Sequence, residues 1–445
     1  MRILQVSTRD VAGGAERSAR NLADAYRELG HESWLAVGEK REGDPFTIEI
    51  PNDRHRGAFV RGVDALRRTP LVRRVRGAGR ATSLLRAAAE PSRVVARELG
   101  HEDFDYPATA HLLELTPAPP DILHLHNLHG GYFDLRELPR LSHRVPTVLN
   151  VRDAWLMTGH CAFPLDGNER WKSGCGDCPD LNIFPAIKRD GTAFNWQRKR
   201  RILAASRLYV ATPSEWMMSL VRESIVAPAA VETRVVPNGV DTRVFRPGDR
   251  AVARAAIGVA PDVPMLLVAA NGIRQNIWKD YVTLRAALTI VGEAVPNTVV
   301  IAVGENAPPE RLGSLELRFV PFESDSSRLA DYYRAADVYV HAARVESFGN
   351  VLLEARACGT PIVSTATGGI PEQVPEGTGV LVPPFAPQAL AMRTIELLRD
   401  APLRARIAAA GMEHVHKNLS LRVQAERFLA WYAEILDREA RHAAG

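Results

Sequence analysis

The 445-residue sequence is poor in the features that mark secreted, membrane-spanning or nucleic-acid-binding proteins. Four cysteines are too few for a disulfide scaffold and suit a reducing cytoplasm. Every apolar run is far shorter than the roughly 20 residues of a membrane-spanning helix. The 56 basic residues nearly balance the 52 acidic ones, and a net charge of +4 indicates no nucleic-acid partner. The first strand-like residues run directly into Arg9 and Asp10, unlike a signal peptide. We therefore expect a cytoplasmic globular protein.

Short apolar runs alternate with helical patterns along both halves of the chain, which predicts an α/β fold with parallel sheets covered on both faces. The expected strands are residues 3–7, 34–37, 121–126, 147–151 and 208–212 in the first half, and 265–270, 298–303, 317–320, 338–341 and 361–364 in the second. The length favours two domains, which we place at residues 1–237 and 238–420. A last helix over residues 421–445 has an apolar face and is expected to pack back on the first domain.

The most informative stretch runs from His341 to Val374 and contains Glu346 and Glu354, eight positions apart. The turn Ser347-Phe348-Gly349 lies between them and opens a helical run that begins near Asn350. Free N–H groups at a helix start favour an anion, so this turn is a candidate phosphate cradle. Two flanking carboxylates suit the hydroxyls of a nucleotide sugar. The alternative is an ordinary helix of an α/β domain with an incidental glutamate pair.

Polar residues also follow three strands of the first half. Gly13 and Gly14 follow the first strand and let the backbone approach a ligand. His126 ends the 121–126 strand, where an imidazole can hydrogen-bond a substrate hydroxyl or a leaving-group oxygen, and Asn127 comes next. Asp153 follows the 147–151 strand and either contacts an acceptor hydroxyl or caps a helix. A plain turn and a structural histidine are the alternatives.

Two cations, Arg274 and Lys279, follow the first strand of the second half. An arginine fork and a lysine point charge suit a diphosphate, and both would stabilise charge on a departing one. An exposed loop with two ordinary basic residues is the alternative.

The loop over residues 155–179 contains most of the cysteines. His160, Cys161, Cys175 and Cys178 lie within nineteen residues, and the C-x2-C pair resembles a structural zinc site. Reduced thiols in a substrate loop, or a disulfide, are the other interpretations.

An insertion over residues 54–98 is rich in arginine. Between Arg54 and Arg97 it holds twelve arginines against Asp64 and Glu90. Apolar residues recur there at helical spacing: Phe59, Val63 and Leu66, then Leu71, Val72 and Val75. A basic amphipathic segment of this kind favours an anionic membrane surface, which would make the protein peripheral on the cytoplasmic face. The alternative is a solvated helical insertion whose arginines pair elsewhere. Nucleic acid is disfavoured because no aromatic residues interleave with the arginines.

Together these motifs resemble the retaining glycosyltransferases of family 4. The resemblance rests on Gly13-Gly14-x-Glu16, the His126 strand, Pro237-Asn-Gly-Val-Asp241, Gly272-x-Arg274…Lys279-Asp280 and Glu346-x7-Glu354. It implies a GT-B fold, with two Rossmann-like domains facing a cleft, the donor in the second domain, and the last helix crossing back. The cysteine loop resembles that of a subset that makes bacterial exopolysaccharide.

The resemblance also implies roles for individual residues. The implied catalytic residues are His126, Arg274, Lys279 and Glu346. The implied donor-binding residues are Gly14, Arg274, Lys279, Ser347, Phe348, Gly349, Asn350 and Glu354. The implied acceptor-side residues are Gly13, Asn127 and Asp153. Arg152 departs from the pattern, because many relatives have a histidine before the aspartate.

The implied reaction is metal-independent, retaining transfer of a sugar from a UDP- or GDP-sugar to a glycan, a lipid-linked acceptor or a small molecule. No cofactor is required, and front-face substitution is favoured because no residue stands out as a nucleophile. A D-x-D sequence, Asp103-Phe104-Asp105, lies away from any strand end and is assigned no metal role. A nucleotide-sugar epimerase of the same fold and an inactive membrane-associated scaffold are the alternatives.

Overall fold

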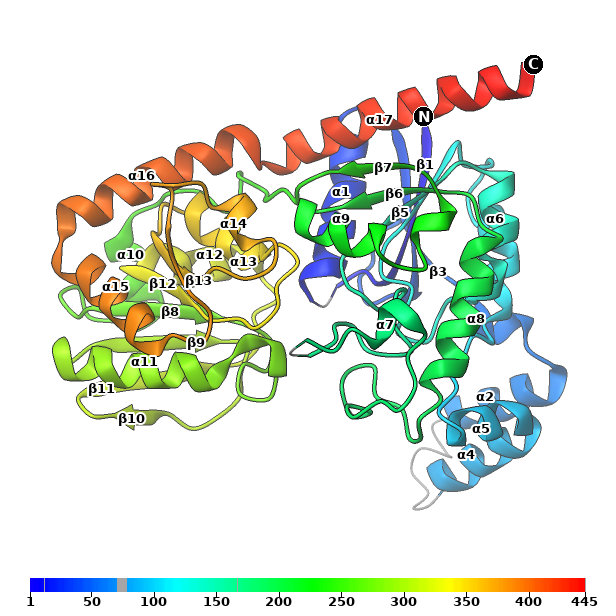
Figure 1. Ribbon diagram of the computed structural model, residues 1–445, viewed down its shortest axis with the longest axis horizontal. Coiled ribbons are helices and arrows are strands. Elements are labelled where there is room, and N and C mark those ends of the chain that lie inside the picture. The colour runs from blue at the N-terminus through cyan, green and yellow to red at the C-terminus, as the bar shows by residue number, and fades with distance from the viewer. Residues whose placement is uncertain (12, 70–77, 166, 445) are drawn as a thin grey trace.

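The computed structural model describes residues 1–444 apart from 12, 70–77 and 166, and it contains two seven-stranded sheets in separate halves of the chain (Figure 1). The first sheet has the order β3-β2-β1-β4-β5-β6-β7 and the second the order β10-β11-β9-β8-β12-β13-β14. All neighbouring strands are parallel except β10 and β11. The predicted α/β class with two doubly wound sheets is confirmed.

The strands of the first sheet are β1 (Arg2–Arg9), β2 (Glu32–Glu39), β3 (Thr47–Glu49), β4 (Ile122–Leu125), β5 (Thr147–Asn150), β6 (Leu208–Thr212) and β7 (Ala230–Val235). Those of the second are β8 (Met265–Ala269), β9 (Val299–Val303), β10 (Glu310–Leu312), β11 (Leu315–Val320), β12 (Val338–His341), β13 (Ile362–Thr365) and β14 (Val380–Val382).

The α-helices of the first half are α1 (Gly14–Glu28), α2 (Ala58–Arg68), α4 (Ala78–Ala89), α5 (Pro91–Glu98), α6 (Leu138–Arg144), α7 (Arg170–Ser173), α8 (Thr192–Ala204) and α9 (Glu215–Arg222). Those of the second half are α10 (Arg250–Ala256), α11 (Tyr281–Ala294), α12 (Ser326–Ala335), α13 (Asn350–Ala357), α14 (Ile370–Gln373), α15 (Pro387–Arg399), α16 (Ala401–Asn418) and α17 (Leu421–Ala444). Short 3-10 helices connect them: η1 (Asn52–His55), η2 (Pro107–Glu114), η3 (Leu135–Glu137), η4 (Ala227–Ala229) and η5 (Ile277–Lys279).

The central strands are uniformly apolar because both faces of each sheet are buried. Along β8, Met265 and Leu267 join one core cluster, whereas Leu266 and Val268 join the cluster on the opposite face. In both sheets the strand order reverses beside the central strand, between β1 and β4 and between β8 and β12. Open α/β sheets bind ligands at the carboxyl ends of the strands at such a reversal. The fold therefore directs attention to the loops after these four strands.

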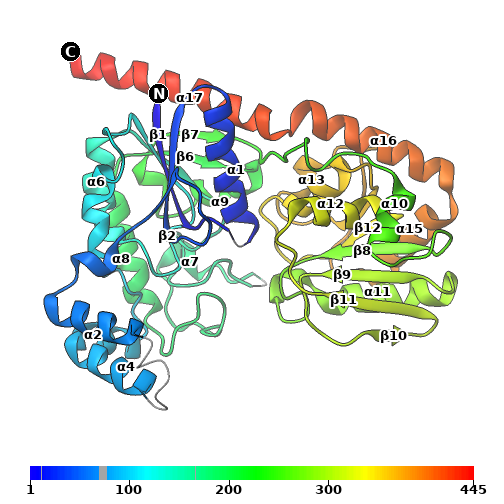
Figure 2. The same ribbon diagram turned by 180° about the vertical axis from the view of Figure 1, so that it is seen from behind.

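The last helix crosses from the second domain to the first, as predicted (Figure 2). Trp431 and Tyr432 on α17 are fully buried against α1 and the first sheet. The Tyr432 hydroxyl lies 2.7 Å from His124 Nδ1 and 3.1 Å from the hydroxyl of Tyr26 on α1. This returning helix joins the two halves independently of the segment between the sheets.

The arginine-rich insertion forms a helical lobe, which we define as α2, α4 and α5, at the edge of the first domain (Figure 1). Of the apolar residues expected to share one helical face, Val63 is buried at 7% exposure, whereas Phe59 is 62% and Leu66 48% exposed. Leu71, Val72 and Val75 lie outside the described residues.

Several arginines of the lobe take part in internal ion pairs. Buried Arg56 pairs with Glu90 and with Asp105, and Arg93 pairs with Glu90 at 3.0 Å and with Asp103 at 2.5 Å. These contacts support the alternative in which arginines of the insertion pair elsewhere. They also occupy both carboxylates of the D-x-D sequence.

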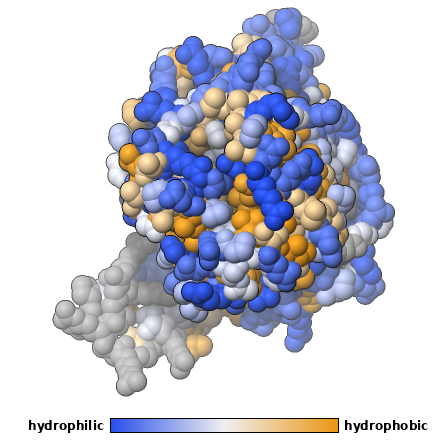
Figure 3. All heavy atoms as spheres, turned by 90° about the vertical axis from the view of Figure 1, so that its left-hand side faces the viewer, coloured by the Kyte–Doolittle hydropathy of each residue, from blue (hydrophilic) through white to orange (hydrophobic). Residues whose placement is uncertain are grey.

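The outer face of the second domain shows apolar side chains scattered among hydrophilic ones (Figure 3). Within the described part of the chain, no helix is long and apolar enough to cross a bilayer.

Candidate functional site

The loops at the carboxyl ends of the two sheets meet at the junction of the domains. The loop after β12 ends at Gly349, whose left-handed φ of +86° a residue with a Cβ rarely adopts, and α13 starts directly after it. Across the junction, α1 starts at Gly14 after the loop that follows β1. The Asn350 side chain donates to the Gly14 carbonyl oxygen at 3.3 Å and accepts from the Asn238 amide at 2.9 Å. The two glycine turns predicted from the sequence are thus brought together.

Lys279 and Glu346 form a close ion pair at the carboxyl edge of the second sheet. Lys279 Nζ lies 2.5 Å from Glu346 Oε2, and both side chains are largely buried. Burial opposes ionisation of Glu346, but the ammonium of Lys279 outweighs it and lowers the pKa of this carboxyl below its usual range. The His341 imidazole, 3.9 Å from the same oxygen, has its pKa lowered to about 3 by burial and is neutral. Glu346 is therefore a fixed anion that holds a cation in place.

Glu354 is held differently, although both glutamates are buried. Burial raises the pKa of its carboxyl, and only partial compensation comes from Arg17 and from the Tyr333 hydroxyl. Tyr333 donates to Glu354 Oε2 at 2.8 Å, and Arg17 of the first domain lies 3.6 Å from Oε1. A small cavity between the domains is lined by Glu354, Asn350, Gly14 and Arg17 among others. The Glu354 carboxylate thus faces the domain junction, and its neighbours compensate only part of the cost of burying its charge.

Arg274 does not join this group. Its guanidinium lies 3.8 Å from Glu310 on β10 and over the ring of Phe319 on β11, at 5.6 Å from the centroid. Its backbone N–H donates to Glu305. Arg274 therefore contacts the edge of the second sheet rather than Lys279 or Glu346.

His126 is buried beneath the junction. It is 2% exposed, its Nε2 lies 2.8 Å from Gln5 Oε1 on β1, and its Nδ1 has no partner. Burial, with His124 and Arg152 nearby, lowers the pKa of His126 well below its ordinary value, so the ring is neutral. His124 is hydrogen-bonded to the Tyr432 hydroxyl and so helps to hold α17 against the first domain. Asn127 directs its carbonyl oxygen to the Tyr132 hydroxyl at 2.7 Å, and Gly13 is the N-cap of α1.

A histidine that the sequence analysis did not assign lies beside Asp153. His129 Nε2 is 2.9 Å from Asp153 Oδ2, and Asp153 Oδ1 accepts from the Trp155 backbone N–H at 2.9 Å. Burial disfavours charging of His129, but Asp153 outweighs it and raises the pKa of the imidazole. The available signal was topological: β4 and β5 are parallel neighbours, so residues shortly after each strand lie side by side.

Comparisons with known proteins agree with this arrangement. A family model described as Glycosyltransferase Family 4 matches residues 12–244, and one described as Glycosyl transferases group 1 matches residues 265–414. The chain belongs to glycosyltransferase family 4. The first range covers β2 to β7 of the first sheet, and the second covers all strands of the second sheet.

Two curated relatives and one solved structure illustrate the similarity. D-inositol 3-phosphate glycosyltransferase 2 from Catenulispora acidiphila is 40% identical over 45% of this chain, which spans about half (49%) of that relative. D-inositol 3-phosphate glycosyltransferase from Saccharomonospora viridis is 36% identical over 69% of this chain and 71% of its own length. The structure of HepE from Anabaena in complex with UDP-glucose matches 98% of this chain and all (100%) of its own, with 18% identity and a TM-score of 0.60. This last likeness shows the fold alone.

In the part of the cysteine loop that the structure describes, the thiols form neither a disulfide nor a cluster arranged to hold a metal ion. All four cysteines are free, so the disulfide interpretation is wrong. Among the described residues, no group of three or more His, Cys, Asp or Glu side chains is arranged to hold a metal ion. Cys178 Sγ faces His160 Nε2 at 3.7 Å, while Cys175 Sγ accepts from the Gly159 N–H. Burial raises the pKa of Cys161 to about 12, so its thiol is not reactive at neutral pH.

Proposed function

We propose that the protein transfers a sugar from a UDP- or GDP-sugar to an acceptor hydroxyl with retention of anomeric configuration. The observation that carries the proposal is the Lys279–Glu346 pair beside the N-terminus of α13, opposite Gly14 of the first domain. A fixed cation and free backbone N–H groups suit a diphosphate. The complex of HepE with UDP-glucose supports the donor class.

We assign the donor contacts as follows. Lys279 and the backbone N–H groups of Gly349 and Asn350 hold the diphosphate, and Arg274 joins them by leaving Glu310. Glu354 accepts hydrogen bonds from the ribose hydroxyls, because its carboxylate is buried and only partly compensated. Glu346 accepts from a hydroxyl of the donor sugar. Lys279, Arg274 and the backbone N–H groups stabilise the negative charge that develops on the departing nucleotide.

We propose front-face substitution for the chemical step. The bond between the anomeric carbon and the phosphate oxygen breaks, and the acceptor oxygen forms its bond on the same face. The acceptor proton passes to the departing phosphate oxygen. Arg274 and Lys279 supply the positive charge that a divalent cation would otherwise provide, so activity is expected to persist in EDTA.

His126 is proposed to act as a neutral hydrogen-bonding group. Its Nε2–H donates to Gln5 Oε1, which leaves Nδ1 as an acceptor without a partner in the protein. An acceptor nitrogen beneath the junction suits a hydroxyl of the transferred sugar. Gly13, Asn127 and Asp153 are proposed to lie on the acceptor side.

We propose that residues 1–237 form the acceptor-side domain, that residues 238–420 form the donor-binding domain, and that residues 421–445 form the helix that packs back on the first domain. Two observations support this division: β7 ends at Val235, and Val240 pairs with Ser420 in an isolated parallel bridge. The two crossings between domains thus lie side by side, which suits a hinge.

Attachment of the lobe to the cytoplasmic face of an anionic membrane is proposed from its exposed apolar side chains.

The test is to incubate the protein with a panel of UDP-, GDP- and ADP-sugars and measure release of nucleotide diphosphate. We expect release with one donor class, abolished by Lys279→Gln and unchanged by Lys417→Gln, an exposed lysine on α16 of the second domain. NMR of the product should show the anomeric configuration of the donor. Isomerisation of the donor sugar without an acceptor would indicate an epimerase instead, and inertness towards every donor would reject the proposal.

A further inference from the structure

Two adjoining cavities lie between the lobe and the body of the first domain. The larger, of about 990 Å³, separates α4 and α5 from the β2–β3 edge and η1. The smaller, of about 380 Å³, is lined by His129 and Trp155. Arg97, Tyr106 and Gly131 line both, so the two cavities form one groove, which we call the lobe groove.

One end of the lobe groove lies at the carboxyl edge of the first sheet. His129, which lines the smaller cavity, follows β4 there, and its partner Asp153 follows the neighbouring strand β5. At the same edge Gly14, at the start of α1 after β1, contacts Asn350 of the second domain. A ligand in the groove that reaches past His129 can therefore approach the domain junction.

Five aromatic residues lie behind the groove wall with little of their surface open to a ligand. They are Phe104, Tyr106, Tyr132, Phe133 and Trp155, each at most 8% exposed, and all but Tyr106 belong to the hydrophobic core of the first domain. The groups available to a ligand are therefore mainly the polar and charged side chains of the groove.

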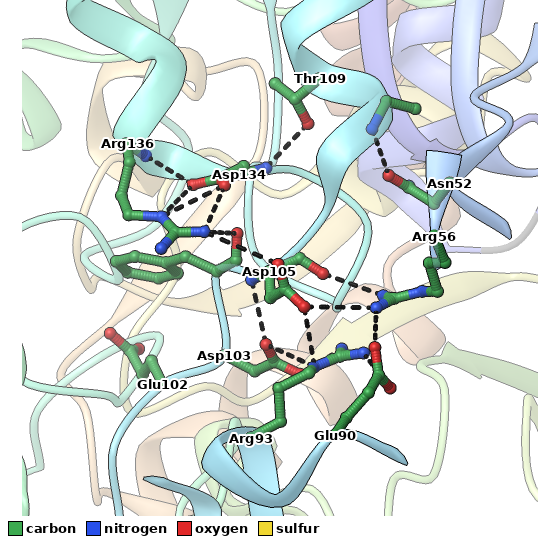
Figure 4. A network of polar contacts seen from close by, with 12 residues as sticks. Asn52, Arg56, Glu90, Arg93, Glu102, Asp103, Asp105, Thr109, Asp134 and Arg136 are labelled. Carbon is green, nitrogen blue, oxygen red and sulfur yellow. Dashed lines mark hydrogen bonds and ion pairs between the residues drawn. The ribbon is translucent and has the colours of Figure 1, made fainter. Parts of the chain in front are cut away.

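The charges of the groove are nearly balanced. Six cations and five carboxylates line it: Arg54, Arg56, Arg86, Arg93, Arg97 and Lys188, against Glu49, Asp53, Glu90, Glu102 and Asp103. Several already pair with one another across the lobe junction, as Arg56 does with Glu90 and Arg93 with Asp103 (Figure 4). Paired groups supply fixed donors and acceptors for hydroxyls but little net attraction for an anion. The same pairs hold the lobe in position, so the groove is preformed.

We propose that the lobe groove binds the growing end of a neutral oligosaccharide acceptor, with the lobe as its outer wall. The proposal rests on the glycosyltransferase function above and narrows its acceptor to a glycan of several sugar units. A terminal hydroxyl is delivered past His129 to the donor, while the preceding units bond through their hydroxyls with the paired charges of the groove.

The test compares acceptors of one to about six units from neutral gluco-, galacto- and manno-oligosaccharide series, alongside inositol phosphate. With the donor class that releases nucleotide, KM is expected to fall at least tenfold between one unit and four units in one series. Ser83→Trp and Val94→Trp place a large ring in the groove wall and should remove that gain. Ser92→Trp, an exposed serine on α5 that does not line the groove, is the matched control and should behave as wild type.

The outcomes separate this inference from the proposed function. Binding of a nucleotide sugar, measured as a rise in melting temperature, should be equal in wild type and all three variants. If no donor binds, the proposed function itself fails. If donors bind but KM is independent of acceptor length, if Val94→Trp retains the gain, or if inositol phosphate is preferred over every glycan, the groove assignment is overturned.

Discussion

At the scale of single residues, the two glutamates of the donor site differ because their neighbours differ. Glu346 has Lys279 at 2.5 Å and a lowered pKa, whereas Glu354 has a hydroxyl, a more distant guanidinium and a raised pKa. The first pair is compensated within the protein. At Glu354, part of the free-energy cost of burying a carboxylate remains until a ligand donates a hydrogen bond to it.

Replacement of Glu354 by glutamine should stabilise the ligand-free protein and weaken donor binding. The amide oxygen can still accept from Tyr333, and the buried carboxylate charge is removed. Because the folded-state pKa of Glu354 is raised, wild type loses stability as pH rises through the unfolded and then the folded pKa. The melting temperature of E354Q should therefore exceed that of wild type at neutral pH, and the two should converge in acid.

Donor affinity of the same variant should fall about tenfold or more, as expected when charge-assisted hydrogen bonds are lost. Thermal denaturation across pH and titration with the donor measure both effects. Glu426→Gln on the exposed side of α17 is the control. Equal melting temperatures throughout the pH range would contradict this account of the Glu354 environment.

Asp153→Asn should lower stability in a pH-dependent way. The His129 pKa is raised in the folded state, so its pair with Asp153 stabilises fully below the unfolded pKa and is lost as pH rises through the folded pKa. Asparagine can keep the bond to the Trp155 N–H but carries no charge. We expect a loss of about 1–2 kcal/mol near pH 6 and a much smaller one near pH 9. A loss independent of pH would show that the pair is not ionic.

At the scale of elements, central strands and the motifs after them were predictable, whereas edge strands were not. β8 and β12 are apolar on both faces, so their runs stand out, and Lys279 and Glu346 follow them in the chain. β3, β10 and β14 have three residues each at or near sheet edges and leave no such pattern. Contacts between the domains also leave no pattern in the sequence, because they join residues that are far apart along the chain.

The orientation of a cation within a loop was likewise unpredictable. Arg274 follows β8 as expected, but Glu310 and Phe319, which come from β10 and β11, determine where its guanidinium lies. The lobe shows the same limit. Helical spacing predicted one apolar face there, whereas tertiary packing buries Val60 and Val63 and leaves Phe59 outside.

The exposed apolar side chains of the lobe should mediate membrane attachment. Phe59 is 62% and Leu84 71% exposed, on α2 and α4. Replacing each by serine should reduce affinity for phosphatidylglycerol vesicles by about tenfold, given about 1–2 kcal/mol for partial insertion of such a side chain. Sedimentation with vesicles measures this. Val282→Ser, 76% exposed on α11 of the second domain, is the control. Equal binding of Phe59→Ser, Leu84→Ser and wild type would reject attachment through the lobe.

At the scale of the whole molecule, the two domains are held together at their junction by a helix cap shared between them. The α9 N-terminus belongs to the first domain, and Ser214 caps it by accepting from Met217 N–H. The carboxylate of Glu372, on α14 of the second domain, accepts from the backbone N–H groups of Glu215 at 2.6 Å and Trp216 at 2.7 Å. An anion at a helix start is favoured by the helix dipole and by otherwise free donors. Glu372 thus completes a cap that the first domain leaves partly open.

Glu372→Ala should shift the protein towards more open arrangements without unfolding either domain. The variant loses two charge-assisted hydrogen bonds at an exposed position, about 1–3 kcal/mol of domain contact, whereas the α17 packing that joins the halves remains. Small-angle scattering should show a larger radius of gyration for the ligand-free variant than for wild type. Saturating donor should reduce the difference, because a ligand bound by both domains favours the closed arrangement. Glu376→Ala, a nearby exposed glutamate, is the control. An unchanged radius in the absence of ligand would mean that α17 and the crossing segments alone set the domain arrangement.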